Sequence, residues 1–75
     1  MAEAMDDRVK GLFLIFKDAL QDEQEAQAKY KKAAQLSDDK ELKEVFESLY
    51  RDELRHENVL LRRYKVFRKK FNIAD

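Results

Sequence analysis

The chain has 75 residues, with no cysteine, no proline and a single glycine, Gly11. These counts exclude disulfides, cysteine-ligated metals and thiol catalysis, and they argue against β-rich folds, whose turns need glycine and proline. Sixteen basic and sixteen acidic residues cancel, so net charge provides no attraction to nucleic acid or to an anionic membrane. Charged residues at 43% and apolar residues at 44% are typical of amphipathic helices.

A chain of this length is expected to form one small domain, residues 1–75. Domains of this size usually depend on disulfides, metals or partner chains for stability. The longest apolar run, residues 12–16, is far shorter than the roughly 20 residues that a membrane-spanning helix needs. We therefore expect a cytoplasmic protein that does not enter a membrane.

Apolar residues in the first half recur at alternating steps of four and three, the heptad period of helices that pack against one another. The pattern predicts a helix over about residues 6–36, and one position of its packing row is acidic, Glu23. The row consists of Met5, Val9, Leu12, Phe16, Ala19, Glu23, Ala26, Tyr30 and Ala33.

The second half repeats this period and predicts a helix over about residues 39–71. Its row holds two polar residues, Glu53 and His56, among Leu42, Phe46, Leu49, Leu60, Tyr64 and Phe67. Two N-caps fit the break between the helices: Asp38, which has capping-box spacing to Glu41, and Asp39. A turn this short predicts an antiparallel hairpin.

The hairpin carries more apolar surface than one partner helix covers. The additional residues are Val45, Val59 and Val66 on one flank of the second helix, Tyr50, Leu54 and Leu61 on the other, and Phe13, Ile15 and Leu20 on the first helix. We expect an all-α protein in which two hairpins form a homodimer, a four-helix bundle with two-fold symmetry. Larger assemblies of dimers are compatible with this arrangement.

The three ionisable residues in the packing rows lie at one height. Glu23 precedes the turn by about 14 residues and Glu53 follows it by about 15, so both stand roughly 21–23 Å from the turn at 1.5 Å per residue. Glu53 and His56, three residues apart, share a helix face. Buried carboxylates are rare unless they are paired or bind a cation. Carboxylates with imidazole suit iron, manganese or zinc, and a two-fold partner doubles the set around two ions.

The sequence also resembles a known family at these positions. The segment from Glu23 to Tyr30 has the Glu, the Ala three residues later (Ala26) and the Tyr seven residues later of the first ligand helix of rubrerythrins. Glu53-Leu-Arg-His56 resembles their second ligand helix, and the helix start at Asp39-Lys-Glu-Leu42 is similar too. The resemblance covers about residues 12–64, which is one half of a ferritin-like domain.

The resemblance implies a four-helix di-iron protein, an oxidoreductase that reduces oxygen or peroxide or a ferroxidase that oxidises Fe(II) for storage. It makes Glu23, Glu53 and His56 metal ligands and places Tyr30 near the site, where it is interpreted as a core residue, with a catalytic role as the alternative. A single half resembles the two-helix encapsulated ferritins, which build the site between subunits. Rubrerythrins also carry a cysteine-ligated rubredoxin domain, and without cysteine we expect an external electron donor.

Other interpretations stay open. The hairpin can be a non-catalytic dimer that acts as a scaffold or adaptor. A basic cluster near the second helix end is interpreted as complementing the helix dipole, and nucleic-acid binding through it is the less favoured alternative. Its members are Arg62, Arg63, Lys65, Arg68, Lys69 and Lys70. Three residues flank the site and are interpreted as solvated helix positions, with ligand orientation or an iron entry path as the alternatives: Gln27, Asp52 and Glu57.

Overall fold

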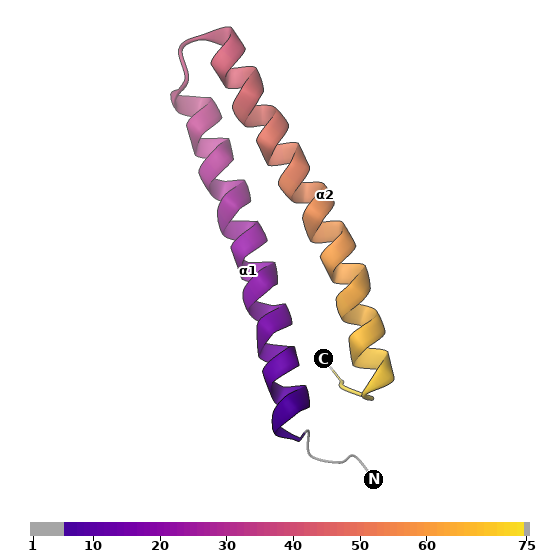
Figure 1. Cartoon of the computed structure of the whole chain (residues 1–75). Helices are drawn as coiled ribbons and strands as arrows, with labels where there is room; N and C mark the ends of the chain where they lie inside the picture. Colours follow the sequence, from indigo (N-terminus) through magenta and orange to yellow (C-terminus); the bar gives the residue numbers. More distant parts are fainter. Residues whose placement is uncertain (1–5, 75) are drawn as a thin grey trace.

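The computed structural model describes residues 6–74 and consists of two antiparallel α-helices, α1 (Asp7–Leu36) and α2 (Lys40–Lys70). They form a hairpin 57 Å long, with the turn at one end and both the start of α1 and the end of α2 at the other (Figure 1). The expected all-α antiparallel hairpin is therefore confirmed, and the helix ends lie within a residue of the expected positions. Met5, which the heptad pattern includes, lies outside the described residues.

Each helix begins at an aspartate whose carboxylate accepts a backbone N–H of the first turn. Asp6 accepts from Val9 at 2.9 Å, and Asp39 accepts from Leu42 at 3.2 Å. Of the two caps that the sequence allowed for α2, the structure uses Asp39. At the end of α1 the Ser37 hydroxyl donates to the carbonyl of Ala33 at 2.7 Å, which satisfies one of the free carbonyls of the last turn.

The best-packed part of the hairpin is an aromatic cluster near the chain ends, formed by Phe13, Phe16, Tyr64 and Phe67. The ring of Phe16 lies 5.5 Å from that of Tyr64 and 5.0 Å from that of Phe67, measured between centroids. Tyr64 and Phe67 are buried, together with Ala34 near the turn. Aromatic pairs at these separations stabilise a core beyond the area that they bury.

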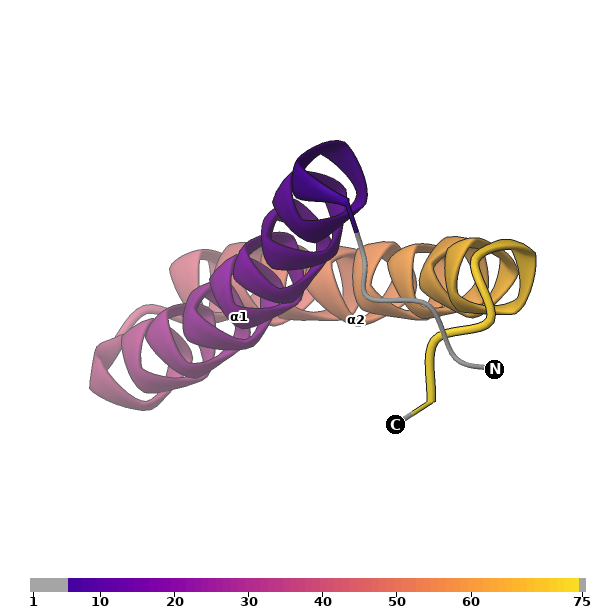
Figure 2. The ribbon, with the colours of Figure 1, turned by 90° about the horizontal axis from the view of Figure 1, so that it is seen from below.

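The helix axes cross rather than run parallel, as the view along the hairpin shows (Figure 2). Two residues that the heptad pattern placed between the helices are consequently exposed, Leu12 at 42% and Leu42 at 45%. Two helices that cross cannot cover both sides of a heptad row, so these positions face away from the neighbouring helix. The surplus apolar surface expected from the sequence is present and includes Ile15, Val45, Val59, Leu61 and Val66.

Neither helix, over the described residues, has a stretch long and apolar enough to cross a bilayer.

Candidate metal centre

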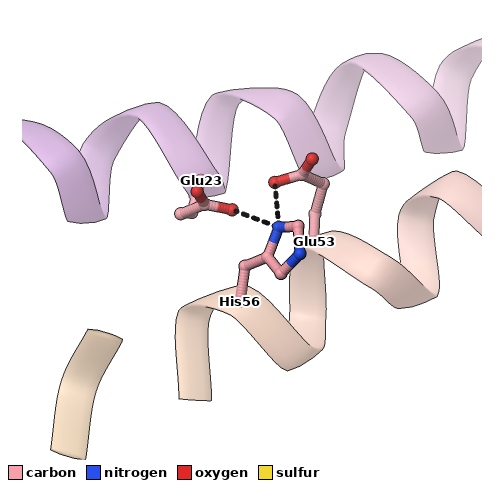
Figure 3. Close-up of side chains that lie close together, drawn as sticks. All are labelled: Glu23, Glu53 and His56. Carbon is pink, nitrogen blue, oxygen red and sulfur yellow. Dashed lines mark ion pairs between the residues drawn. The ribbon is translucent and has the colours of Figure 1, made fainter. Parts of the chain in front are cut away.

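Glu23 of α1 meets Glu53 and His56 of α2 across the hairpin (Figure 3). The Nδ1 atom of His56 lies 3.8 Å from Oε2 of Glu23 and 3.7 Å from Oε2 of Glu53. One potential ligand atom from each residue lies within 4.8 Å of the other two. The equal heights inferred from the sequence thus bring these three side chains together.

The three side chains differ in exposure. The exposed fractions are 24% for Glu23, 19% for Glu53 and 62% for His56. The sequence pattern placed all three in the core, whereas in this single chain the imidazole stands largely outside it. The two carboxylates are therefore mostly shielded from solvent, whereas the cluster is open to solvent at His56.

Glu23 has an unsatisfied oxygen. Its Oε2 atom is buried and, among the described residues, has no hydrogen-bond partner. The nearest nitrogen, Nδ1 of His56 at 3.8 Å, is too distant for a hydrogen bond. An unpaired buried carboxylate oxygen costs free energy, and a bound cation removes that cost.

Glu23 and Glu53 also compete for protons. The pKa of Glu23 is raised, first because a hydrogen bond between the two carboxyl groups requires a proton on one of them. Burial and the charge of Glu53 act in the same direction, and His56 opposes them. A group that favours its protonated form because a second carboxylate stands beside it equally favours a cation in the proton's place.

The donor chemistry fits a transition metal. Two carboxylates and one imidazole suit iron, manganese or zinc and lack the thiolates that softer ions prefer. Together with the unpaired Glu23 oxygen, this set fits an iron, manganese or zinc ion, which Glu23, Glu53 and His56 would hold. Three side chains leave coordination positions that this chain alone does not fill.

A second polar group lies at the same level. Glu57 accepts a hydrogen bond from Nε2 of Gln24 at 3.0 Å on one oxygen and from Nε2 of Gln27 at 2.9 Å on the other. The pKa of Glu57 is lowered, mainly by the hydrogen bond from Gln27 and next by the one from Gln24, because both bonds favour the charged carboxylate. Gln27 and Glu57, interpreted from the sequence as solvated positions, are half-buried and also joined across the helices.

Sequence reasoning missed Gln24 altogether. The available signal was its height, because it follows Glu23 directly and faces the same level of α2. Asp52, the third flanking residue, pairs with Arg55 within α2 and takes no part in the contacts between the helices that the structure shows.

Tyr30 lies away from the cluster. Its ring stacks on Phe46 with the centroids 6.5 Å apart. Seven residues separate it from Glu23, which is about 10 Å along the helix at 1.5 Å per residue. Its catalytic role stays a prediction.

A groove of about 430 Å³ adjoins the cluster on its open side. Glu23 and His56 form its wall together with Ala19, Val59, Leu60 and Arg63. Beyond the groove, the exposed Val45, Val59 and Val66 lie at alternating steps of three and four residues that also include His56, so they share one face of α2. On α1 the spacing of the exposed Leu12 and Ile15 places them on one face with Ala19. We call this surface the open face.

The basic residues expected near the end of α2 occupy its last turns, with Arg68, Lys69 and Lys70 in the final one. Arg68 lies over the ring of Tyr64, 5.5 Å from its centroid, and its Nε donates to the carbonyl of Ile73 at 3.4 Å. These contacts agree with a role in ending the helix.

The family model described as rubrerythrin matches residues 11–74, which includes α1 from residue 11 onward, all of α2 and the whole carboxylate–histidine cluster. Comparisons with curated proteins and with solved structures find no match.

Proposed function

The chain belongs to the rubrerythrin family, and from this premise we propose that it is a di-iron carboxylate protein whose metal centre lies between two copies of the chain. Members of this ferritin-like family bind iron. The observation that carries the proposal is the convergence of Glu23, Glu53 and His56, with one buried carboxylate oxygen left unpaired.

The side chains have distinct roles in this proposal. Glu23 and Glu53 bind the cation and offset its charge, and His56 binds from the exposed side. When bound, iron supplies one-electron chemistry toward dioxygen or hydrogen peroxide, each of which accepts electrons from Fe(II). With no cysteine in the chain, re-reduction depends on a separate electron donor.

A second copy of the chain on the open face completes the site. One hairpin supplies three ligand residues, and a two-fold axis at their level supplies the same three again, the set of a ferritin-like centre. The second copy also covers the groove and the exposed Ile15, Val45 and Val59. A largely apolar surface that continues into an incomplete ligand set fits a copy of itself better than an unrelated partner.

Charge along α2 favours one orientation of the two copies. The turn and the start of α2, residues 38–47, hold five acidic residues against Lys40 and Lys43. The last turn of α2 contains Arg68, Lys69 and Lys70. A two-fold axis perpendicular to the helices stacks the two α2 helices antiparallel, with the basic end of each beside the acidic start of the other. An axis along the bundle instead gathers both basic ends together.

Metal content and solution mass, measured on one preparation purified without chelators, test the proposal. We expect dimers with about one iron per chain and, on adding Fe(II) and oxidant, oxidation that requires His56. Failure to bind iron, manganese or zinc after reconstitution overturns it. Dimers without metal instead favour the scaffold interpretation. Comparing the consumption of dioxygen with that of peroxide distinguishes iron oxidation from peroxide reduction.

A further inference from the structure

Gln24, Gln27 and Glu57 form a polar tie between the helices, which we call the interhelical clamp. Both oxygens of Glu57 on α2 are occupied, each by the side-chain amide of a different α1 residue, at 3.0 and 2.9 Å. Hydrogen bonds to a charged acceptor are stronger than neutral ones and more directional than apolar contacts. A carboxylate held at both oxygens fixes α2 in rotation as well as in position along α1.

The clamp lies directly beside the ligands in the sequence. Gln24 follows Glu23, and Glu57 follows His56. Because Glu57 and His56 are neighbours on α2, a rotation of α2 about its axis moves both side chains together. A change of one residue in helix register corresponds to a rotation of about 100°. The aromatic contacts between the helices lie elsewhere, with the aromatic cluster beyond the ligands on one side and the Tyr30–Phe46 pair toward the turn.

We propose that Gln24, Gln27 and Glu57 are positioning residues that hold α1 and α2 in the rotation at which Glu23, Glu53 and His56 converge on one cation. The inference rests on the proposed function, since it states how this chain arranges the ligands of that centre. The clamp touches no ligand atom in the contacts that the structure shows. It acts by fixing the helices that carry the ligands.

Cobalt(II) is the probe, because its visible absorption reports coordination number as well as binding. Glu57→Ala removes both bonds of the clamp and leaves every ligand in place. We expect about tenfold weaker Co(II) binding, the usual lower range for losing groups that orient ligands, and an altered visible band at saturating cobalt. A clamp residue with a purely structural role lowers the melting temperature without changing that band.

A repulsion-and-rescue pair makes the test specific. Gln27→Glu places a like charge opposite Glu57, so we expect weaker Co(II) binding. Adding Glu57→Gln to that variant restores one amide–carboxylate bond across the helices and should restore affinity to within about threefold of wild type. The matched control is Gln21→Ala, which removes a similar bond, Gln21 Nε2 to Glu25 at 2.9 Å, within α1 alone. It should leave cobalt binding unchanged.

The outcomes separate the inference from the proposed function. Circular dichroism first establishes that each variant is helical at the assay temperature. Wild type that binds no cobalt overturns both. Wild type that binds, with Glu57→Ala unchanged in affinity and visible band, overturns the positioning role alone. Tighter binding by Gln27→Glu also overturns it, because the new carboxylate then acts as a ligand.

Discussion

The aromatic cluster and the carboxylate–histidine level lie on the same pair of helices, but opposite physical effects dominate them. In the cluster, the half-buried ring of Phe16 packs 5.0–5.5 Å from the buried rings of Tyr64 and Phe67. Midway along the hairpin, two carboxylates face each other, one oxygen is unpaired and the imidazole is 62% exposed. The aromatic cluster stabilises the fold by itself. The opposed carboxylates are stabilised only when a proton or a cation neutralises them.

This difference assigns separate tasks to the two regions. Apolar packing lowers the free energy of the folded chain whether or not a ligand is present. Opposed carboxylates raise it until a proton or cation neutralises them. The interhelical clamp lies at the level of the second region, where its two hydrogen bonds join α1 to α2.

The largest effect is expected in the aromatic cluster. Phe67→Ala removes a buried ring that contacts Phe16, Tyr64 and Phe71 and should cost about 3 kcal/mol of unfolding free energy. The loss should be equal with and without metal, as measured by urea denaturation in chelator and in Co(II). Phe71→Ala is the matched control, because its ring is 41% exposed and should cost much less. Equal losses for the two variants contradict the assignment of the core to this cluster.

The second effect is a change in stability on replacing Glu53, and it should depend on whether metal is bound. Without metal, Glu53→Ala removes one of two opposed carboxylates, so the variant should be as stable as wild type or more stable. At a Co(II) concentration a hundredfold above its dissociation constant, wild type alone should gain about 2.7 kcal/mol. Thermal melts of both proteins in chelator and in cobalt measure this.

The opposite pattern identifies a structural polar network. If Glu53 serves only as a hydrogen-bond partner in the core, its removal strands the group that it satisfied and costs about 1–3 kcal/mol in chelator. A large loss in chelator, with no gain for wild type on adding metal, therefore contradicts the metal centre and supports the scaffold interpretation.

The sequence predicted the level of the site but not its surroundings. Heptad spacing and the position of the turn set the heights of Glu23, Glu53 and His56, and these follow from the rise of a helix alone. The exposure of Leu12, Leu42 and His56 depends on the angle at which the helices cross, which a heptad row does not specify. The clamp depends on that angle too, so the height of Gln24 alone did not reveal its contact with Glu57.

The third effect is a pH dependence of the Co(II) affinity, which arises from the ionisable side chains of the proposed metal centre. Metal and proton compete for Glu23, whose raised pKa means that protons begin to displace metal above the ordinary value of 4.5. Co(II) affinity should therefore fall as pH decreases toward 4.5, by about tenfold per unit for each proton displaced. Binding curves from pH 7.5 to about pH 5 measure the slope. An affinity independent of pH contradicts carboxylate and imidazole ligation.

Metal-free stability should respond with two opposite signs. The folded state holds the Glu23 proton more tightly than the unfolded state does, so acidification toward 4.5 should stabilise the metal-free hairpin relative to neutral pH. Glu57 has a lowered folded pKa, so its contribution is present above 4.5 and is lost as the pH falls below that value. Urea denaturation in chelator across this range, with Glu57→Gln for comparison, separates the two groups.

The smallest effect concerns a residue far from both regions. Asp39 caps α2 at the turn, where its carboxylate accepts the Leu42 N–H at 3.2 Å, and Asp39→Ala should cost about 1 kcal/mol. The turn lies roughly 20 Å from the ligands at 1.5 Å per residue, so Co(II) affinity of the folded protein should stay within twofold of wild type. Asp38→Ala is the matched control, because Asp39 already provides the cap, and it should leave the unfolding free energy nearly unchanged. A cobalt affinity that falls together with stability in Asp39→Ala contradicts the separation of the two regions, since it means that the ligand geometry depends on the whole hairpin rather than on the contacts at its own level.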